Sequence, residues 1–189
     1  IRAVERSRGG GDVYKRQDYT YAVIEDWAKL PDGWSFKEAA AVGADSNDNV
    51  YVFSRGEHPI MVFDRNGNFL KSWGSGLFAG PHGITVDLDN SYWLTDRDAH
   101  IVQKYSPQGN LLMTLGNRNI SSDTGYDKTN KVVKTESGPF NLPTKVALDS
   151  KGNIYVADGY GNARIHRFSP DGKLMISWGK PGNRPGEFH

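Results

Sequence analysis

One pattern of turns and apolar runs occurs three times in this chain and limits what it can fold into. In its clearest copy, residues 142–179, the four apolar runs are Val146–Leu148, Ile154–Ala157, Arg164–Phe168 and Leu174–Trp178. The segments between these runs are rich in Gly, Asn, Asp and Pro, which favour tight turns because Gly and Asn tolerate positive φ and Pro fixes φ. Each copy is therefore predicted to form a four-stranded antiparallel sheet of consecutive strands.

Two spacings show that the three copies are one repeat. A turn Asp precedes a central aromatic residue by six positions in the pairs Asp45 and Tyr51, Asp87 and Trp93, and Asp149 and Tyr155. A later turn Gly precedes a closing Gly by seven positions in the pairs Gly67 and Gly74, Gly109 and Gly116, and Gly172 and Gly179. Four-stranded repeats of about 40 residues are typical of β-propeller blades. The central aromatic residues follow the strand pattern and are predicted to lie in the blade cores.

The repeats predict an all-β fold with about three blades, the first two at about 38–74 and 80–116 and the third in the copy described above. The polar residues 117–136 between the second and third blades are predicted to form a surface loop. Propellers close with typically four to eight blades, so we expect residues 18–189 to be part of a ring. Its partners would be further, C-terminal blades of the same propeller, and without them both end faces of the three-blade unit would be exposed.

Residues 1–17 do not follow the repeat. The segment Ile1–Gly11 is charged and Gly-rich and lacks the apolar region of a signal peptide. One codon choice for Asp12–Gln17, GATGTGTATAAGAGACAG, matches a transposon end used in sequencing adaptors. We interpret 1–17 as a non-native or disordered leader. After it, partial alternation at 18–26 predicts a strand, and Trp34 is predicted to plug or bridge blades.

Composition excludes several classes of partner. The chain has 23 basic and 22 acidic residues, and this near balance gives no electrostatic footprint for nucleic acid or an anionic membrane. No apolar run approaches the length of a transmembrane helix. Cys is absent, so no disulfide can form. We therefore expect neither nucleic acid nor a membrane as a partner, and the compartment stays open.

The repeat, with its Asn-x-Tyr-Val, Phe-Ser-Pro-Asp-Gly and Trp-Gly elements, resembles the NHL repeat of RNA-binding, protein-interaction and sensor propellers and of one group of enzymes. Four motifs resemble that group, the peptidyl-α-hydroxyglycine α-amidating lyases. They lie at 52–56 (Val-Phe-Ser-Arg-Gly), 80–83 (Gly-Pro-His-Gly), 158–165 (Asp-Gly-Tyr-Gly-Asn-Ala-Arg-Ile) and 184–188 (Arg-Pro-Gly-Glu-Phe). The resemblance covers about 30–189 and implies the first half of a six-bladed catalytic core.

The resemblance also implies a set of site residues. In that family three His from different blades hold zinc in the central channel, and a structural calcium ion is bound partly by backbone carbonyls. His82 matches the first zinc ligand, Arg55 the active-site Arg, and Tyr160 the catalytic Tyr. Val42 and Ile84 match the calcium-binding carbonyl positions. The other two zinc ligands of the family fall beyond this sequence, and two Cys of the animal enzymes correspond to positions near Asn141 and Gly161, which are not Cys here.

The residues themselves leave structural alternatives open. His82 could be a loop His bonded to the backbone, Tyr160 an aromatic cap on a turn, and Arg55 one partner of a salt bridge at the rim. A phenol can serve as a base only when a neighbouring cation stabilises the phenolate, and here Arg55 or zinc would be that cation. The remaining candidate His residues are predicted at the surface or a blade edge: His58, His100 and His166. Two turn carboxylates are predicted to accept backbone N–H bonds: Asp96 and Asp158.

Two functions are compatible with these features. The first is a zinc-dependent lyase that splits the C–N bond of a small peptide-like substrate, a peptidyl-α-hydroxyglycine, into a peptide amide and glyoxylate. The alternative is a non-catalytic NHL propeller that binds a ligand or a protein as a scaffold or sensor, since a fold alone does not imply an activity.

Overall fold

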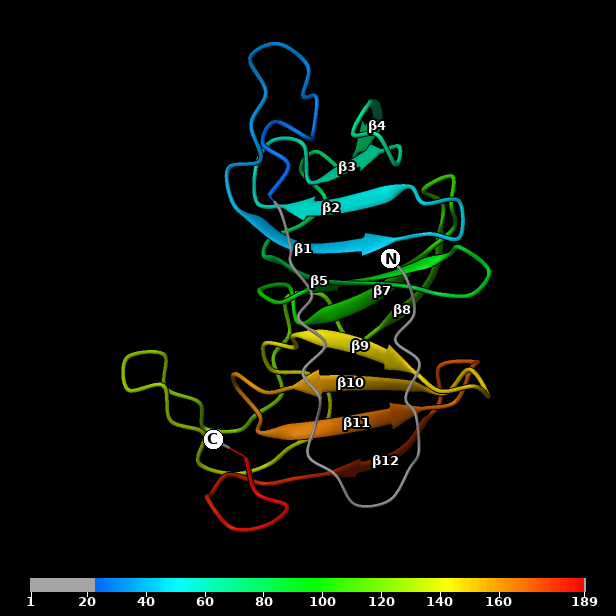
Figure 1. The fold of residues 1–189 in the computed structure, drawn as a ribbon. Coiled ribbons are helices and arrows are strands. Elements are labelled where there is room, and N and C mark those ends of the chain that lie inside the picture. The colour runs from blue at the N-terminus through cyan, green and yellow to red at the C-terminus, as the bar shows by residue number, and fades with distance from the viewer. Residues whose placement is uncertain (1–22, 189) are drawn as a thin grey trace, which may run out of the picture.

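The computed structural model describes residues 23–188, and in this range the chain forms twelve strands and no helix. The strands make three four-stranded antiparallel sheets whose strand order follows the chain, and Figure 1 shows the sheets fanned out one after another. This confirms the predicted all-β propeller blades. The leader at 1–17 lies outside the described residues, as does most of the expected strand at 18–26; the part from 23 to 26 forms no strand. The described residues include no helix that could span a membrane.

Each sheet corresponds to one copy of the repeat. The first contains β1 (Ala39–Ala44), β2 (Val50–Ser54), β3 (Ile60–Phe63) and β4 (Phe69–Trp73). The second contains β5 (Pro81–Val86), β6 (Tyr92–Asp96), β7 (Ile101–Tyr105) and β8 (Leu111–Leu115). The third contains β9 (Lys145–Leu148), β10 (Ile154–Asp158), β11 (Arg164–Phe168) and β12 (Leu174–Trp178). In the third sheet β11 and β12 have the predicted bounds, while β9 begins and β10 ends one residue beyond them.

Apolar side chains between neighbouring sheets form the two largest core clusters. The cluster between the first and second sheets contains Tyr51, Phe53, Ile60, Val62, Ile84, Tyr92, Leu94 and Tyr105. The cluster between the second and third sheets contains Trp93, Val102, Leu115, Phe140, Val146, Ile154, Val156 and Phe168. Burial of apolar area stabilises a fold by roughly 25 cal/mol per Å². Because these clusters lie between sheets, the stability of each blade depends on its neighbour. Tyr51 and Trp93 are buried as predicted, whereas Tyr155 is partly exposed because it lines the outer face of the third sheet.

The two end faces of the three-sheet unit differ. Residues 27–36 cover the outer face of the first sheet, where Trp27, Trp34 and Phe36 pack on a buried cluster that includes Phe63. The backbone N–H of Lys29 donates to the Gly67 carbonyl at 2.8 Å and fixes this segment beside the sheet. The expectation that both end faces are exposed was therefore wrong for the first sheet, because the aromatic residues of the preceding segment cover it.

The outer face of the third sheet is open. It carries a hollow of about 270 Å³ whose lining is almost entirely apolar and comprises Lys145, Val146, Ala147, Tyr155, Ala157 and Ile165. On the neighbouring strand β12, Ile176 and Trp178 are 53% and 39% exposed. An apolar face of this kind is what one propeller blade offers to the next.

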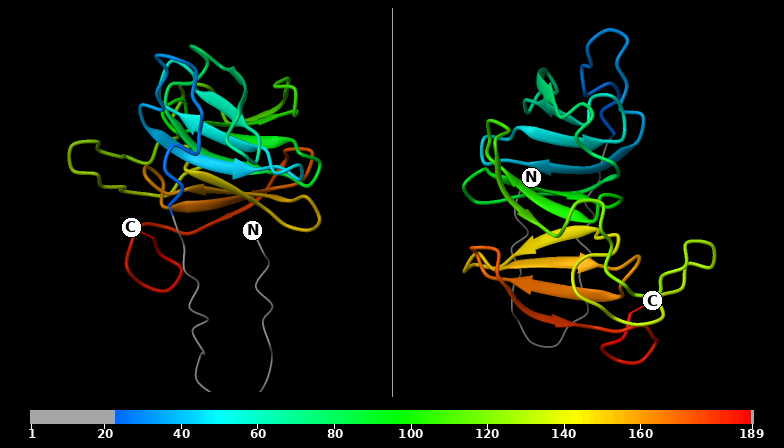
Figure 2. Two further views of the ribbon diagram at one scale, coloured as in Figure 1. Left: turned by 45° about the horizontal axis from the view of Figure 1, so that its top comes forward. Right: turned by 180° about the vertical axis from the view of Figure 1, so that it is seen from behind.

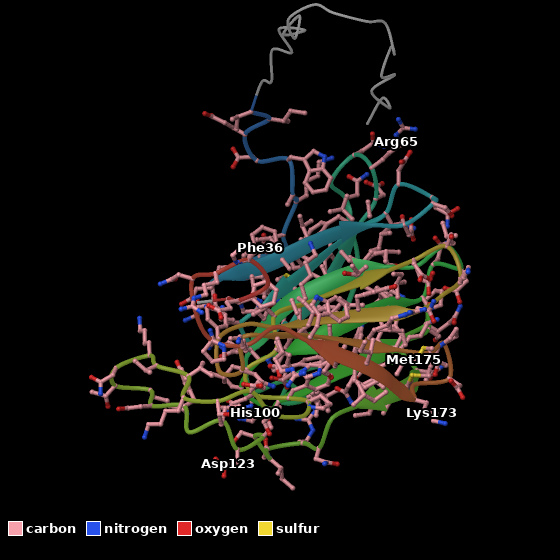
Figure 3. The ribbon with its side chains drawn as sticks, turned by 90° about the horizontal axis from the view of Figure 1, so that it is seen from below. Phe36, Arg65, His100, Asp123, Lys173 and Met175 are labelled. Atoms are coloured by element: carbon pink, nitrogen blue, oxygen red, sulfur yellow. The ribbon has the colours of Figure 1, made fainter. Side chains whose placement is uncertain are left out.

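The strand ends form two rims. The Asx rim carries the β1–β2 and β3–β4 turns and their equivalents, at 45–49, 64–68, 87–91, 106–110, 149–153 and 169–173. The loop rim carries the turns at 55–59, 97–100 and 159–163 and the connections between sheets. Figure 3 shows Arg65, Lys173 and Met175 towards the Asx rim, with Phe36, His100 and Asp123 towards the loop rim. The loop at 117–138 projects from the loop rim (Figure 2), and most of its residues are exposed, as predicted.

Hydrogen bonds at the Asx rim repeat from blade to blade. The carboxylate of Asp149 accepts from the backbone N–H of Asn153 at 2.9 Å and from its side chain at 2.7 Å, and Tyr155 adds a bond at 3.2 Å. Asp45 makes the same three kinds of contact in the first blade. The second blade differs, because there Asp87 binds Lys104 at 3.1 Å. The Asn153 side chain, with the backbone donors of the turn, lowers the pKa of Asp149 to about 2.

Buried carboxylates join the blades to the segments that precede them. As predicted, Asp96 and Asp158 accept backbone N–H bonds, from Gly80 at 2.8 Å and from Asn141 at 2.9 Å. Asp158 also binds Nε2 of His166 at 3.1 Å, and that pair is fully buried. The prediction that His166 lies at the surface or a blade edge was wrong, because this carboxylate and Ser177, 2.7 Å from the other ring nitrogen, hold the imidazole inside the sheet.

Candidate functional site

His82 is placed by an irregularity at the start of β5. The pairing of β5 with β6 shifts between Pro81 and Gly83, which makes His82 the extra residue of a β-bulge. Bulges re-aim side chains and are over-represented next to active sites. Strand β1 has an equivalent shift between Ala39 and Ala41, but there the extra residue is alanine. The same backbone feature thus presents an imidazole in one blade and a methyl group in the other.

Gly83 allows β5 to approach β9 closely. A Cβ at this position would collide with the carbonyl oxygen of Thr144. The approach brings Nδ1 of His82 to 2.9 Å from that same oxygen. Because a carbonyl oxygen can only accept, Nδ1 carries the proton and Nε2 keeps its lone pair. Metal-binding His residues are commonly oriented in this way by a backbone carbonyl.

The surroundings of His82 favour the neutral imidazole. Partial burial lowers the pKa of His82 below its ordinary value, and the positive charges of Arg97 and Arg55 lower it further. The hydrogen bond to Thr144 acts in the opposite direction but does not reverse the shift. The ring therefore keeps an unprotonated Nε2 at neutral pH, which is the form that binds zinc.

Tyr160 lies beside His82 although it comes from the third blade. It belongs to the turn after β10 on the loop rim, and its hydroxyl oxygen is 3.4 Å from Nε2 of His82. The two ring centroids are 5.5 Å apart, and 52% of Tyr160 is exposed. Since Nε2 carries a lone pair, the hydroxyl is the donor. The fold thus unites two of the predicted site residues.

The turn that carries Tyr160 is held by the loop before β9. The backbone N–H of Gly161 donates to the Asn141 carbonyl at 3.0 Å, and Thr124 donates to the Gly161 carbonyl. A Cβ at residue 161 would collide with Asn141, whereas Gly159 faces open space. Packing therefore requires only one of the two glycines that flank Tyr160. The positions that resemblance aligns near two Cys, 141 and 161, are in direct contact here.

Arg55 lies on the other side of the His82 strand. Its Nε donates to the Pro81 carbonyl at 3.1 Å, and its Nη1 binds Glu38 at 2.6 Å. The side chains of Arg55 and Glu38 are 35% and 68% exposed, so this ion pair contributes little to stability. The salt-bridge alternative for Arg55 is thus realised, and the same side chain still reaches the residue next to His82.

Sequence reasoning missed Arg97, which lies on the turn between β6 and β7. Its Nε and Nη2 bind the two oxygens of Asp98 at 2.8 and 2.9 Å. These bonds raise the pKa of Arg97 above its ordinary value, and Tyr160 is close enough to raise it further when ionised. The repeat held the signal, because Arg97 follows Asp87 by ten residues and Arg55 follows Asp45 by ten.

The other predicted His residues have different surroundings. His58 stacks on Trp34 with ring centroids 3.2 Å apart. His100 accepts a hydrogen bond from the backbone N–H of Leu142 at 3.1 Å. Neither contact involves His82 or Tyr160.

The residues that the structure describes form no complete metal site. Between residues 23 and 188, no three His, Cys, Asp or Glu side chains come together in a way that could hold a metal. His82 fits the role of one zinc ligand because Nε2 is unprotonated and faces Tyr160. The expected calcium-binding positions lie on the neighbouring strands β1 and β5, where Val42 is 63% exposed and Ile84 is 2% exposed.

The sequence matches proteins of known class. The NHL repeat family matches residues 140–168. Peptidylglycine alpha-amidating monooxygenase of Rattus norvegicus is 34% identical over 184 residues, which cover 80% of this chain and 18% of the rat protein. Peptidyl-alpha-hydroxyglycine alpha-amidating lyase 2 of Drosophila melanogaster is 30% identical, over 86% of this chain and 43% of the fly protein. This chain is an NHL-repeat β-propeller that resembles the amidating lyases.

Solved structures agree with the propeller fold. The NHL propeller superimposes on a virginiamycin B lyase from Staphylococcus aureus, a catalytically inactive variant with quinupristin, with a TM-score of 0.55 and 15% identity. That match covers 79% of this chain and 43% of the lyase chain. At this identity the likeness concerns the fold alone. The NHL propeller described here thus spans less than half the length of each of these relatives.

Proposed function

We propose that this chain forms one side of the active site of a zinc-dependent peptidyl-α-hydroxyglycine amidating lyase. The observation that carries the proposal is the meeting of His82 and Tyr160, from two blades, at 3.4 Å. Arg55 and Arg97 add two guanidinium groups around them. The similarity to named amidating lyases supports the choice of this reaction among those that such a site could perform.

In the proposed reaction Tyr160 is the base in its phenolate form, which a neighbouring cation stabilises. Its oxygen takes the proton of the substrate hydroxyl while the carbon–oxygen double bond of glyoxylate forms. The electron pair of the breaking C–N bond passes to the amide nitrogen, which takes that proton from Tyr160 and leaves as the peptide amide, so the phenolate is restored. Arg55 stabilises the negative charge that develops in the substrate or on Tyr160, since preorganised donors are most effective where charge develops.

Two metal ions complete the proposal. Zinc held by His82 and by ligands from other blades would supply Lewis-acid chemistry at the substrate hydroxyl. Backbone carbonyls of Val42 and Ile84 would hold a structural calcium ion, because calcium prefers oxygen ligands. Nδ1 of His82 stays bonded to Thr144, so its role is to present Nε2 in a fixed orientation.

The proposed partners are a small peptide-like substrate and further blades of the same propeller. The open apolar face of the third sheet, around the hollow of about 270 Å³, supports the second proposal, because a following blade would cover it. The near balance of 23 basic and 22 acidic residues supports the absence of nucleic acid or a membrane among the partners.

Glyoxylate release tests the proposed activity. The full-length protein that carries this sequence, loaded with zinc, should release glyoxylate from a synthetic peptidyl-α-hydroxyglycine well above the rate in buffer. Release at the buffer rate by a folded, zinc-loaded protein would end the lyase proposal. The non-catalytic scaffold or sensor would then be the better description.

A further inference from the structure

The second blade places a charged pair, Arg97 and Asp98, next to the strand that carries His82. Arg97 and Asp98 lie on the turn that follows β6, at the place in the repeat where Arg55 follows β2. The backbone N–H of Arg97 donates to the Gly80 carbonyl at 2.9 Å. A Cβ on Gly80 would collide with the Asp98 side chain, so the pair packs directly against this glycine. Gly80 is two residues before His82, and the pair is therefore fixed at the entrance to the bulge.

One edge of the Arg97 guanidinium is available for a ligand. Asp98 occupies the edge formed by Nε and Nη2, and among residues 23–188 no hydrogen bond engages Nη1. A guanidinium has five N–H donors in a fixed fork and can bind a carboxylate with two parallel bonds at more than one edge. The Arg97 side chain is 28% exposed, so the side chain is partly accessible while most of it is withdrawn from water.

Opposite charge near this guanidinium comes chiefly from Asp98. The groups close enough to affect Asp98 by their charge are Arg97, Arg55 and Lys128, all of them cations. The carboxylate of Glu38 is already engaged by Arg55 at 2.6 Å. A second carboxylate that approached Arg97 would meet the cations Arg97, Arg55 and Lys128 as well as the carboxylates of Asp98 and Asp96.

We propose that Arg97 binds the carboxylate of the ligand, and that Asp98 holds the guanidinium in place and competes with that ligand. This inference rests on the proposed function, because the reacting end of a peptidyl-α-hydroxyglycine carries a carboxylate. Arg97 then selects a free α-carboxylate over an amide, and Tyr160 and His82 act on the adjoining carbon. Arg97 thus has a role in specificity that is separate from proton transfer.

Calorimetric titration with two unreactive probes tests the assignment. Benzoylglycine carries the carboxylate, and benzoylglycinamide is its neutral counterpart. The full-length protein should prefer benzoylglycine, and Arg97→Gln should weaken binding of benzoylglycine about ten- to a hundredfold, as expected for hydrogen bonds to a charged group. Binding of benzoylglycinamide should not change. Arg65→Gln, on the Asx rim, is the matched control and should leave both affinities unchanged.

Asp98→Asn separates binding from a purely structural role. It removes the competing charge and keeps the shape that packs on Gly80, so it should leave benzoylglycine binding equal to or tighter than in the unaltered protein. If Arg97→Gln keeps the preference for carboxylate, or if the unaltered protein has none, the assignment of Arg97 is wrong. Glyoxylate release is measured in parallel: its absence together with Arg97-dependent carboxylate binding would reject the lyase and retain the carboxylate site.

Discussion

At the Asx rim the first and third blades make the same hydrogen bonds, whereas at the loop rim no two blades have the same turn, although the first two share an Arg. Asp45 and Asp149 each bind an Asn and a Tyr through equivalent contacts. On the loop rim the equivalent turns begin Arg-Gly after β2, Arg-Asp after β6 and Gly-Tyr after β10. The residues of the Asx-rim turns are thus explained by the folding of a hairpin alone. The residues of the loop-rim turns are not explained in this way, because they change from blade to blade.

This difference indicates where function lies in a repeat protein. A turn that only has to reverse the chain can use one solution in every blade, because each blade poses the same local problem. Side chains that act together on one ligand are free to differ, because they approach it from different directions. The bulge at His82 follows this rule, since the equivalent bulge in β1 contains alanine. Substitutions at the two rims should accordingly affect different properties.

The largest effect is expected for Tyr160→Phe, which removes one oxygen on the loop rim. Loss of a positioned base typically lowers a rate by about 10²–10⁴, so glyoxylate release by the full-length protein should fall by that factor. The matched control is Tyr155→Phe, which removes the phenol bonded to Asp149 on the Asx rim. It should leave the rate unchanged and lower the free energy of unfolding slightly, because one hydrogen bond is lost. Equal rates of glyoxylate release by the two variants would contradict the assignment of function to the loop rim.

The next effect concerns the metal. His82→Ala should lower the zinc affinity of the full-length protein by more than the roughly 10–100-fold that loss of an outer partner of a ligand costs. His58→Ala, which removes the ring stacked on Trp34, should keep zinc stoichiometric. Competition with a zinc-binding dye measures both affinities. Stoichiometric zinc in the His82→Ala protein would place the metal elsewhere.

A stability effect should arise from the buried pair in the third blade. His166→Ala leaves the carboxylate of Asp158 without its imidazole partner and opens a cavity beside Phe140. The free energy of unfolding should fall by about 2–4 kcal/mol. Urea-induced unfolding provides the measurement, and the slope against urea should stay constant. A change below about 0.5 kcal/mol would mean that the pair is not as buried as described.

The smallest effect is a dependence on pH at the Asx rim. The folded-state pKa of Asp149, about 2, lies below the value near 4 expected for the unfolded chain. The contribution of Asp149 to stability is therefore complete above about pH 4 and is lost as the pH falls towards 2. Asn153→Ala removes the main cause of this shift and should flatten the fall in melting temperature between pH 4 and 2. An unchanged profile would assign the fall to other carboxylates.

Much of the fold followed from local sequence patterns, and much of the site did not. The turn chemistry around Asp149 and Gly172 located the strands of the third blade to within one residue, because hairpins are set by residues close in sequence. The burial of His166 depends on Asp158 and Ser177 on neighbouring strands, which composition does not reveal. The cover over the first sheet was also missed, since Trp27 and Phe36 contact residues far along the chain.

The candidate site shows the same limit. His82, Tyr160 and Arg55 were found through resemblance to a family, and their residue types alone left plain structural alternatives. Arg97 was overlooked although its spacing from Asp87 equals that of Arg55 from Asp45. Comparing turns between repeats, and asking where they share a residue that the turn itself does not need, would have found it.

The close approach of Gly83 to Thr144 has a consequence for how the protein can be altered. The Thr144 carbonyl belongs to the third blade and the imidazole of His82 to the second, and the 2.9 Å contact between them decides which ring nitrogen is protonated. A side chain at residue 83 would separate the two backbones and free the ring to exchange its tautomers. The absence of a side chain at residue 83 thus allows the two sheets to approach closely, and this approach fixes which nitrogen of His82 carries the proton.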